Sequence, residues 1–286
     1  MSDPVIQSFY DHATHTITHV LTDSNTRHTA IIDSVLDYDR TSGRTSTDNA
    51  DKVIAYVRDA GLIVDWILET HAHADHLSAA PYLQQQLGGR IGIGRHICEV
   101  QQVFQRIFDL HDLNTNGKDF DHLFENGEQF YVGEMVITAM HTPGHTPACM
   151  TYLVGKDAFV GDTLFMPDYG TARCDFPGGD AAMLYHSIQK IFTLPPDTRL
   201  HLCHDYPPDS RAPMWVTTVE EQSRHNVHVH TGISEATFAN MRTERDKTLS
   251  MPELLMQSVQ VNIRAGKLPN PDINGIRYLK IPVNVF

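Results

Sequence analysis

Three histidines and one aspartate lie within residues 71–76, and this stretch constrains the fold of the chain more than any other. The sequence Thr70-His71-Ala72-His73-Ala74-Asp75-His76 directly follows an apolar run at residues 62–68. Such a run predicts a buried strand, so the loop after it leaves the edge of a sheet, where the backbone can direct several side chains to one point. Neutral imidazole and carboxylate are ligands for zinc, iron and related divalent ions. The stretch therefore predicts a metal site rather than a polar turn that is rich in histidine by accident.

Three further candidate ligands, His145, Asp162 and His204, each follow a predicted strand. A lone histidine at the end of a strand is more often a hydrogen-bonding residue of the fold than a ligand. Here, however, four separate strand ends, including the one before His71, each present a candidate ligand, which is hard to attribute to chance. A glycine directly precedes both His145 and Asp162, and this predicts a tight turn with close approach of the backbone to the site.

Predicted strands and helices alternate along the chain. We expect strands at 16–21, 29–35, 63–69, 134–140, 152–154, 158–160 and 199–203, helices at 49–60, 77–87, 96–109, 234–247 and 252–265, and a loop at 114–121. Asp75 is expected to cap the helix at 77–87. We expect one mixed α/β domain over residues 1–286, because such domains reach this length. Its core would span about residues 1–213, and the extension at about 214–286 would cover the core and help to wall the site.

Composition limits the partners and the compartment. The formal net charge is −13, and no cluster of basic residues is present, which argues against a nucleic-acid partner. The N-terminus lacks a signal-peptide pattern, and no apolar run approaches the length of a membrane span. The four cysteines are scattered without a CxxC pair, as expected of reduced thiols. We therefore expect a cytoplasmic protein with no membrane partner, and a homodimer is compatible with these features.

Two other features of the sequence, a histidine cluster and a cysteine, each allow a structural and a functional interpretation. The histidines at positions 225, 228 and 230 form a cluster in the sequence, but no carboxylate or cysteine is spaced to complete a metal site with His225, His228 and His230. A solvated loop or an interface is the favoured interpretation. Cys174 could be a redox-sensitive thiol, but the interpretation as a passive small residue is favoured.

The pattern His71-x-His73-x-Asp75-His76, followed by His145, Asp162 and His204, resembles the metallo-β-lactamase superfamily. This resemblance implies a four-layer αββα sandwich with the metal site at one edge of the two sheets. Within the superfamily, the chain resembles the glyoxalase II branch and, more closely, the persulfide dioxygenases, also called sulfur dioxygenases. The resemblance to these branches in particular rests on residues 142–146, 161–164, 173–176, 184–187, 191–195 and 204–206.

The ligand residues taken alone predict a binuclear hydrolase. His71, His73 and His145 would hold one zinc ion, Asp75, His76 and His204 would hold the other, and Asp162 would bridge them. Two such metals lower the pKa of a bridging water and polarise the carbonyl group that the resulting hydroxide attacks. Glyoxalase II enzymes, which hydrolyse S-acyl glutathione thioesters, are the corresponding branch.

The resemblance to persulfide dioxygenases implies another use of the same residues, and we favour it. One Fe(II) per chain would be held by His71, His145 and Asp162, with three positions open for a thiolate substrate and O₂. The remaining four residues, His73, Asp75, His76 and His204, would orient these ligands and exclude a second ion. The implied reaction is the oxidation of glutathione persulfide by O₂ and water to sulfite and glutathione.

Two residues are candidates for substrate binding. The resemblance implies that Arg173 and Tyr206 contact glutathione, and a guanidinium can grip a carboxylate in a two-pronged pair. Alternatively, Arg173 forms an internal ion pair with Asp175 or Asp162, and Tyr206 contributes to packing without contacting the substrate. The segment Arg242-Thr243-Glu244-Arg245 only partly matches the Arg-x-x-Lys pair that binds glutathione in the glyoxalase II branch. The absence of a clear match counts against a thioesterase.

Overall fold

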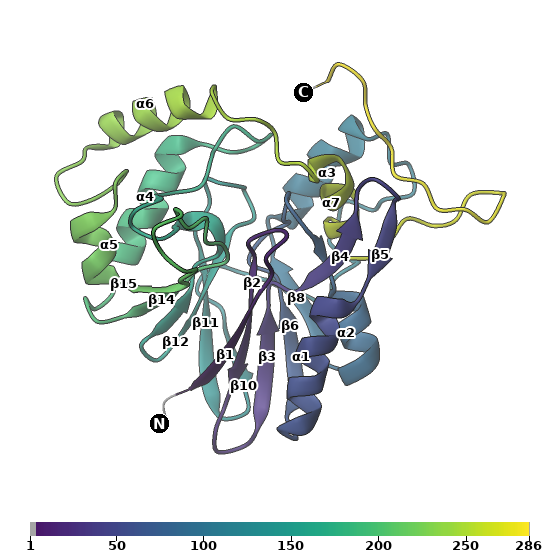
Figure 1. Ribbon diagram of the computed structural model, residues 1–286, viewed down its shortest axis with the longest axis horizontal. Helices are drawn as coiled ribbons and strands as arrows, with labels where there is room; N and C mark the ends of the chain where they lie inside the picture. The colour runs from purple at the N-terminus through teal and green to yellow at the C-terminus, as the bar shows by residue number, and fades with distance from the viewer. Residues whose placement is uncertain (1–3, 286) are drawn as a thin grey trace.

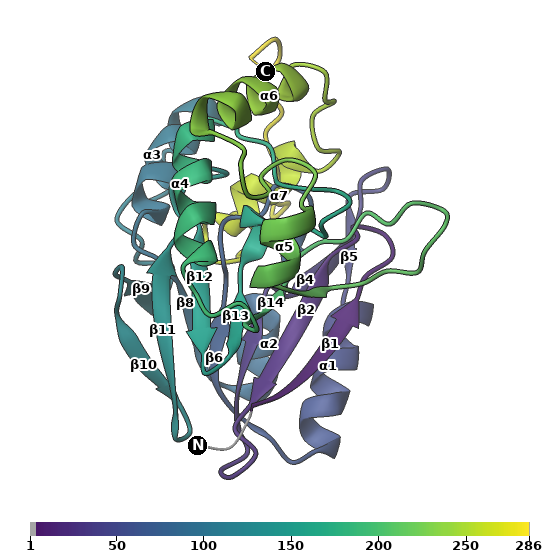
Figure 2. The ribbon, with the colours of Figure 1, turned by 90° about the vertical axis from the view of Figure 1, so that its left-hand side faces the viewer.

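Two six-stranded β-sheets face each other and carry helices on their outer surfaces, as Figures 1 and 2 show. The computed structural model describes residues 4–285. The first sheet has the order β1-β2-β3-β6-β8-β9. Its strands are β1 (Val5–Tyr10), β2 (Ile17–Thr22), β3 (His28–Ile32), β6 (Ile63–Leu68), β8 (Arg90–Gly94) and β9 (His122–Phe124).

The second sheet has the order β10-β11-β12-β13-β14-β15, and a small three-stranded sheet has the order β5-β4-β7. The strands of the second sheet are β10 (Gln129–Val132), β11 (Met135–His141), β12 (Met150–Val154), β13 (Asp157–Phe159), β14 (Arg199–His201) and β15 (Val216–Thr218). Those of the small sheet are β4 (Val35–Asp39), β5 (Arg44–Ser46) and β7 (Leu77–Ser78).

Seven α-helices and one short 3₁₀ helix complete the part of the chain that the structure describes. They are α1 (Asp48–Asp59), α2 (Ala80–Leu87), α3 (Ile97–Ile107), η1 (Gly161–Thr163), α4 (Ala181–Phe192), α5 (Val219–His225), α6 (Glu235–Asp246) and α7 (Leu255–Asn262).

Three separate apolar cores define four layers. The core between the two sheets includes Trp66 of the first and Tyr152 of the second. A second core lies between the first sheet and helices α1, α2 and α3, and it includes Ile93. The third lies between the second sheet and helices α4, α5 and α6, and it includes Ile188 and Phe238. The expected four-layer αββα sandwich is therefore confirmed.

Most of the predicted elements are present, and three local predictions are wrong. The predicted strand at 29–35 is broken at Asp33, whose φ is 54°, so β3 ends before it and β4 begins after it. The predicted helix at 77–87 begins only at Ala80, because residues 77–78 pair with β4 as β7. Ala79 rather than Asp75 stands at the N-cap of that helix. The break at Asp33 and the pairing of β7 with β4 both lie beside the loop at residues 70–76.

The C-terminal segments close the second sheet and cover the ligand loops. Strand β15 lies after residue 213 and pairs with β14, α6 packs on α4, and α7 packs on β7. The last residues leave α7 as an extended segment that projects from the body, drawn in yellow in Figure 1. Among residues 4–285, no helix is long and apolar enough to cross a membrane.

Candidate metal centre

The predicted ligands gather at one edge of the sandwich because of the sheet topology. Strand β6 runs parallel to its neighbours β3 and β8, and β13 runs parallel to β14. The carboxyl ends of parallel strands meet at the same edge of a sheet, where sites are commonly built. The loop after β6 carries His71, His73, Asp75 and His76, and the second sheet contributes the other ligands from the ends of β11, β13 and β14.

Two glycines bring the backbone close to the site, as predicted. Gly144 and Gly161 have φ values of 136° and 53°, which L-residues rarely adopt. A Cβ on Gly161 would lie 2.6 Å from Oγ1 of Thr70, and one on Gly144 would lie 2.3 Å from the backbone of Leu184. Side chains at these positions would therefore push the ligands that follow them away from the first sheet and from α4.

Asp162 lies between two groups of imidazoles. Its Oδ2 is 3.7 Å from Nε2 of His71 and 3.7 Å from Nε2 of His145. Its Oδ1 is 3.5 Å from Nε2 of His204, and that Nε2 is 3.3 Å from Oδ2 of Asp75. Each carboxylate oxygen therefore faces a different group of candidate ligands.

The donor atoms fit a metal ion. Five buried ligand atoms have no hydrogen-bond partner: Nε2 of His71, Nδ1 of His73, Nε2 of His76, Oδ1 of Asp162 and Nε2 of His204. Buried polar atoms are rarely left unpaired, and these converge on one place. Ligand atoms within 4.8 Å of one another form one cluster of His71, His145 and Asp162 and another of His73, Asp75, His76 and His204, and two further groups with Cys203 join Asp162 to His204 and Asp33 to His73. The structure thus brings together all seven predicted ligand residues.

Sequence reasoning missed Asp33, which orients two of these histidines. Its Oδ1 lies 3.0 Å from Nε2 of His73, and its Oδ2 accepts a hydrogen bond of 2.9 Å from Oγ1 of Thr70. That hydroxyl is 3.0 Å from Nδ1 of His71. Glu69 lies on the other side of His73, with Oε2 3.2 Å from the same Nε2. A carboxylate behind a ligating histidine fixes the ring and its tautomer, and the only sequence signal was a polar Asp-Ser pair after an apolar run.

Burial and these carboxylates set the charges of the histidines. Burial and the neighbouring imidazoles, chiefly those of His73 and His145, hold the pKa of His71 well below its usual range. Burial also lowers the pKa of His73, but Asp33 and Glu69 outweigh burial and raise it well above its usual range. His71 is therefore a neutral imidazole with a free lone pair, and Nε2 of His73 carries a proton that the two carboxylates share.

Asn262, at the end of α7, holds the ligand loop from the other side. Its side-chain amide donates to the backbone carbonyls of His73 and His76 at 2.8 and 2.7 Å. Its Oδ1 accepts from the backbone N–H of Ser78 at 2.8 Å. The side chain is buried. One amide from the C-terminal part of the chain thus fixes both ends of the turn that carries three ligands, a link that no local pattern in the sequence reveals.

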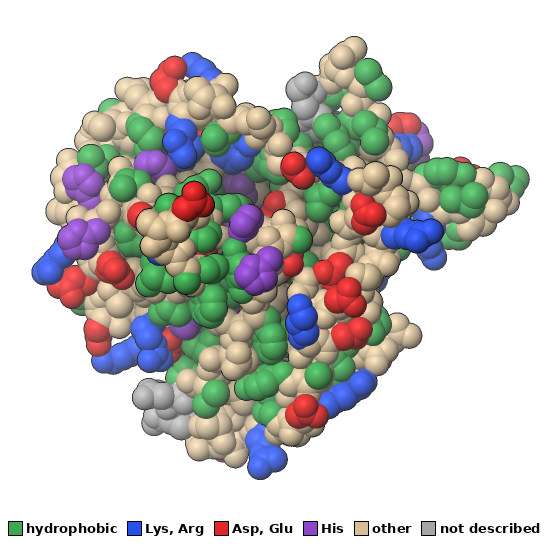
Figure 3. Space-filling model, viewed as in Figure 1, with side chains coloured by type: hydrophobic (Ala, Val, Ile, Leu, Met, Phe, Trp, Pro, Cys, Tyr) green, Lys and Arg blue, Asp and Glu red, His purple; other side chains and the backbone are tan. Residues whose placement is uncertain are grey.

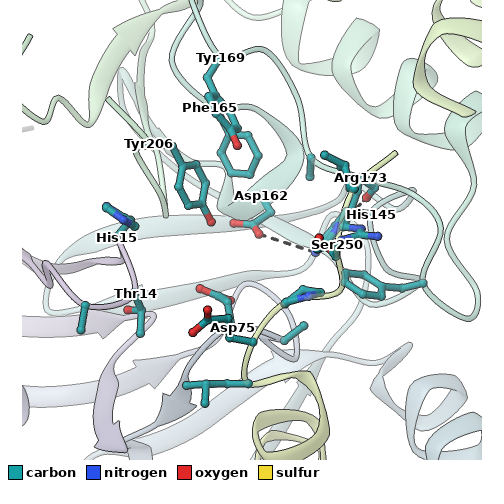
Figure 4. A pocket seen from close by; sticks show the side chains of 18 of the residues that line it. Thr14, His15, Asp75, His145, Asp162, Phe165, Tyr169, Arg173, Tyr206 and Ser250 are labelled. Carbon is teal, nitrogen blue, oxygen red and sulfur yellow. Dashed lines mark hydrogen bonds and ion pairs between the residues drawn. The ribbon is translucent and has the colours of Figure 1, made fainter. Parts of the chain in front are cut away.

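A cavity of about 760 Å³ opens above the ligands, with Asp75, His145 and Asp162 in its lining. Figure 4 shows these side chains pointing into it, with a dashed line between Asp162 and His145. In Figure 3 the same face of the molecule is hollowed, and histidine, basic and acidic side chains gather around the hollow. The volume suits a small organic ligand.

One wall of the cavity is aromatic and includes Tyr206. Its ring is nearly parallel to that of His204, and the two ring centroids are 5.8 Å apart. The centroid of the Tyr169 ring lies 4.9 Å from that of Tyr206. Figure 4 shows its hydroxyl pointing toward Asp162. Burial, with the charges of Asp75 and Asp162, raises the pKa of Tyr206 well above its usual range. The hydroxyl therefore stays protonated near neutral pH and can donate a hydrogen bond into the site.

Arg173 lines the cavity, but its guanidinium is engaged inside the protein. Nε and Nη2 each donate to a carboxylate oxygen of Asp175 at 2.6 Å, and Nη1 donates to the carbonyl of Ser250 at 2.7 Å. Its backbone carbonyl is 2.7 Å from Nδ1 of His145. The internal ion pair with Asp175 that the sequence left open is thus formed, and the backbone of Arg173 orients a ligand.

The two arginines of the segment 242–245 have different environments. Arg242 is buried, pairs with Asp246 and donates to the carbonyl of Thr171 at 3.1 Å. Arg245 is exposed at the cavity wall and forms no ion pair with any residue from 4 to 285. Arg245 is therefore a cation at the cavity that has no internal counter-charge.

The remaining residues that the sequence singled out are not part of the candidate metal centre. His228 is not solvated as expected: its Nδ1 accepts from the backbone N–H of Thr171 at 3.1 Å. His225, His228 and His230 belong to none of the potential metal-ligand clusters among residues 4–285. Cys174 is buried, and burial raises the pKa of its thiol, as expected of an unreactive side chain.

The chain belongs to the metallo-β-lactamase superfamily, whose family model matches residues 9–204. It is 55% identical to a probable metallo-hydrolase of Burkholderia pseudomallei (98% of this chain, 99% of the relative). It is 49% identical to "Glyoxylase B2" of Dictyostelium discoideum (93% and 92%) and 28% identical to the mitochondrial persulfide dioxygenase ETHE1 of Homo sapiens (92% and 89%).

A solved structure, ETHE1 from Myxococcus xanthus, has the same fold. It superposes with a TM-score of 0.74 at 28% identity and covers 92% of this chain and 100% of that chain. The chain spans about 65% of the length of the curated beta-lactamase hydrolase-like proteins that it matches.

We predict that Asn262→Asp weakens metal binding roughly 10- to 100-fold. The carboxylate keeps an acceptor for the N–H of Ser78 but places an oxygen against the carbonyls of His73 and His76, so the ligand turn must shift. Competition with a chelator measures the affinity. The matched control is Gln260→Ala, a buried amide of the same helix that bonds Lys280 instead. Equal affinities in Asn262→Asp and wild type would contradict this role.

For Arg173→Ala we predict a loss of about 1–3 kcal/mol in the free energy of unfolding, because Asp175 loses two charge-assisted hydrogen bonds. Denaturant unfolding of Arg173→Ala, Asp175→Ala and the double variant tests this. The double variant should lose less than the two single losses combined, and strictly additive losses would argue against the pair. A rise in the Michaelis constant in Arg173→Ala but not in Asp175→Ala would identify a substrate contact of Arg173.

Proposed function

We propose that this protein is a persulfide dioxygenase that holds one Fe(II) through His71, His145 and Asp162 and oxidises glutathione persulfide to sulfite and glutathione. The observation that carries the proposal is the cluster of these three residues, in which one oxygen of Asp162 faces both His71 and His145. Two imidazole nitrogens and one carboxylate oxygen are the donor set of non-haem Fe(II) oxygenases. The similarity to persulfide dioxygenases and to a solved ETHE1 structure supports the same reaction.

The metal and the protein have separate tasks in this reaction. Bound Fe(II) would supply the redox chemistry, accepting a thiolate and O₂ at its open positions. Glutathione persulfide, O₂ and water balance against glutathione, sulfite and two protons, so no further redox cofactor is required. The aromatic wall that includes Tyr169 and Tyr206 limits water at the site, and the protonated hydroxyl of Tyr206 donates a hydrogen bond toward the reacting groups.

The cavity also fits the glutathione part of the substrate. Glutathione carries two carboxylates, and Arg245 offers a guanidinium at the cavity wall without an internal partner. Arg173, which the resemblance implies as a glutathione contact, has three of its N–H directions in use, so its contribution would be a secondary one. Figure 4 shows Arg173 beside His145 at one side of the cavity, opposite Tyr206 and His15.

The second candidate is a binuclear zinc hydrolase of the glyoxalase II type. The position of Asp162 favours it, because each carboxylate oxygen faces a different group of ligands, as a bridging ligand would. The relatives named probable metallo-hydrolase and "Glyoxylase B2" are compatible with it. In that enzyme, His73, Asp75, His76 and His204 would bind metal directly rather than orient the ligands of one ion.

Protein purified without oxygen should contain about one iron per chain and consume O₂ only when a persulfide is present. Metal analysis and an oxygen electrode measure this with glutathione persulfide, and S-acyl glutathione serves as the substrate of the alternative. Removal of the metal with a chelator should abolish oxygen uptake, and Fe(II) alone should restore it. Two zinc ions per chain with rapid thioester hydrolysis would reject the proposal in favour of the binuclear hydrolase.

The two candidates also differ in how the ligand residues share the metal. His71→Ala, His145→Ala and Asp162→Ala should each abolish iron binding. His204→Ala should leave most of the iron in place, because His204 faces Oδ1 of Asp162 whereas His71 and His145 face Oδ2. Iron content is measured on each variant after anaerobic loading, with a melting curve to show that the chain is folded. Equal metal loss in all four variants would indicate a binuclear site.

A further inference from the structure

A small cavity, distinct from the one above the ligands, lies beside the metal centre. Its volume is about 20 Å³, which is room for one small molecule. The ligand loop, α3 and α7 supply walls that include Ala72, Val100, Phe104 and Val259, and these residues belong to the apolar core between the first sheet and its helices. The two helices are labelled in Figure 1. His145, a candidate metal ligand, also lines this cavity.

Small side chains in the ligand loop leave this space open. The loop alternates histidines with alanines, and Ala72 and Ala74 both line the cavity. Larger side chains at these two positions would fill a space of this size. Two other lining residues, Pro147 and Pro177, are only half-buried. The cavity therefore reaches from near the surface of the protein to the ring of His145.

The cavity is poorly suited to water. Among residues 4–285, only His145 and Thr146 contribute polar side chains to its lining. Nδ1 of His145 is hydrogen-bonded to the backbone carbonyl of Arg173 at 2.7 Å, and Nε2 faces Asp162. Oγ1 of Thr146 lies 3.1 Å from Sγ of Cys149. A buried water needs about two to four polar partners, and apolar cavities that lack them stay dry and take up apolar ligands such as xenon.

The ring of Phe176 stands between this cavity and the larger one. Phe176 and His145 line both cavities, and their ring centroids are 5.5 Å apart in an edge-to-face contact. The guanidinium carbon of Arg173 lies 5.0 Å from the centroid of the same phenyl ring. A small apolar molecule that passes this ring reaches the metal centre without crossing the polar part of the larger cavity.

We propose that the small cavity holds O₂ and delivers it to the metal centre. This inference rests on the proposed function, in which O₂ is the second reactant. Glutathione persulfide is far too large for a space of about 20 Å³ and would occupy the larger cavity, so O₂ needs a separate way in. Because O₂ is apolar, burial between hydrocarbon walls favours it over water.

Xenon, an apolar atom that serves as a probe for O₂, tests the site itself. Crystals of the full chain pressurised with xenon should show an anomalous diffraction peak bounded by Val100, Phe104 and Phe176, whether or not the enzyme turns over. Val100→Ile adds a methyl group to the wall and should lose most of this peak. Phe104→Leu widens the cavity and should keep the peak.

The kinetic test uses the iron-loaded enzyme and an oxygen electrode. In Val100→Ile the KM for O₂ should rise about tenfold, whereas the KM for glutathione persulfide and kcat at saturating O₂ should stay as in wild type, because the metal ligands are unchanged. The matched control is Val53→Ile, the same substitution at a valine that is also buried in this core but lies on α1 and does not line the cavity. Val53→Ile and Phe104→Leu should both keep the KM for O₂ of wild type.

Three results would overturn this inference while the proposed function stands: no xenon peak in wild type, an unchanged KM for O₂ in Val100→Ile, or an equal rise in Val53→Ile. The last would mean that a general disturbance of the core is the cause. If wild type consumes no O₂ with persulfide, the proposed function fails and the assignment of the cavity to O₂ fails with it. A xenon peak would then mark an apolar cavity without that role.

Discussion

The candidate metal centre depends on the hydrogen bonds that the buried carboxylate of Asp33 makes behind the ligand loop. The carboxylate holds His73 directly and His71 through Thr70, so a single buried charge fixes two ligand rings from two positions of one loop. The backbone of Asp33 has a positive φ of 54°, a conformation that costs free energy and persists only where the surroundings impose it. The break between β3 and β4 is therefore the structural cost of placing this carboxylate beneath the site.

The geometry of the two sheets supplies the rest of the centre. Parallel pairing of β13 with β14 brings Asp162 and His204 to one edge, and parallel pairing of β6 with its neighbours brings the histidine-rich loop to the same edge. Helix α7 then closes the loop through Asn262. The site is thus assembled from segments far apart in the chain, and each is fixed by contacts outside the ligand set.

Much of the fold could be predicted because its determinants are local. The apolar spacing of Ala50, Val53, Ile54 and Val57 lies on one face of α1, and the apolar run before His71 is β6. Periodicity of this kind is the main signal for helices and strands in a sequence. The helix expected at 77–87 was displaced at its start, because the pairing of β7 with β4 is a tertiary contact that overrides local preference.

The sequence by itself determined which residues are candidate ligands, because several imidazole and carboxylate groups at the ends of neighbouring strands are typical of a metal site, and all seven lie close together in the structure. Only the tertiary structure decided what supports and surrounds them. Arg173 is paired with Asp175 while Arg245 remains available at the cavity, and neither outcome is visible in residue types or spacing. The reason is physical: ligand identity is a property of side-chain chemistry, whereas a hydrogen-bond partner is set by which distant segments the packed sheets bring within about 3 Å.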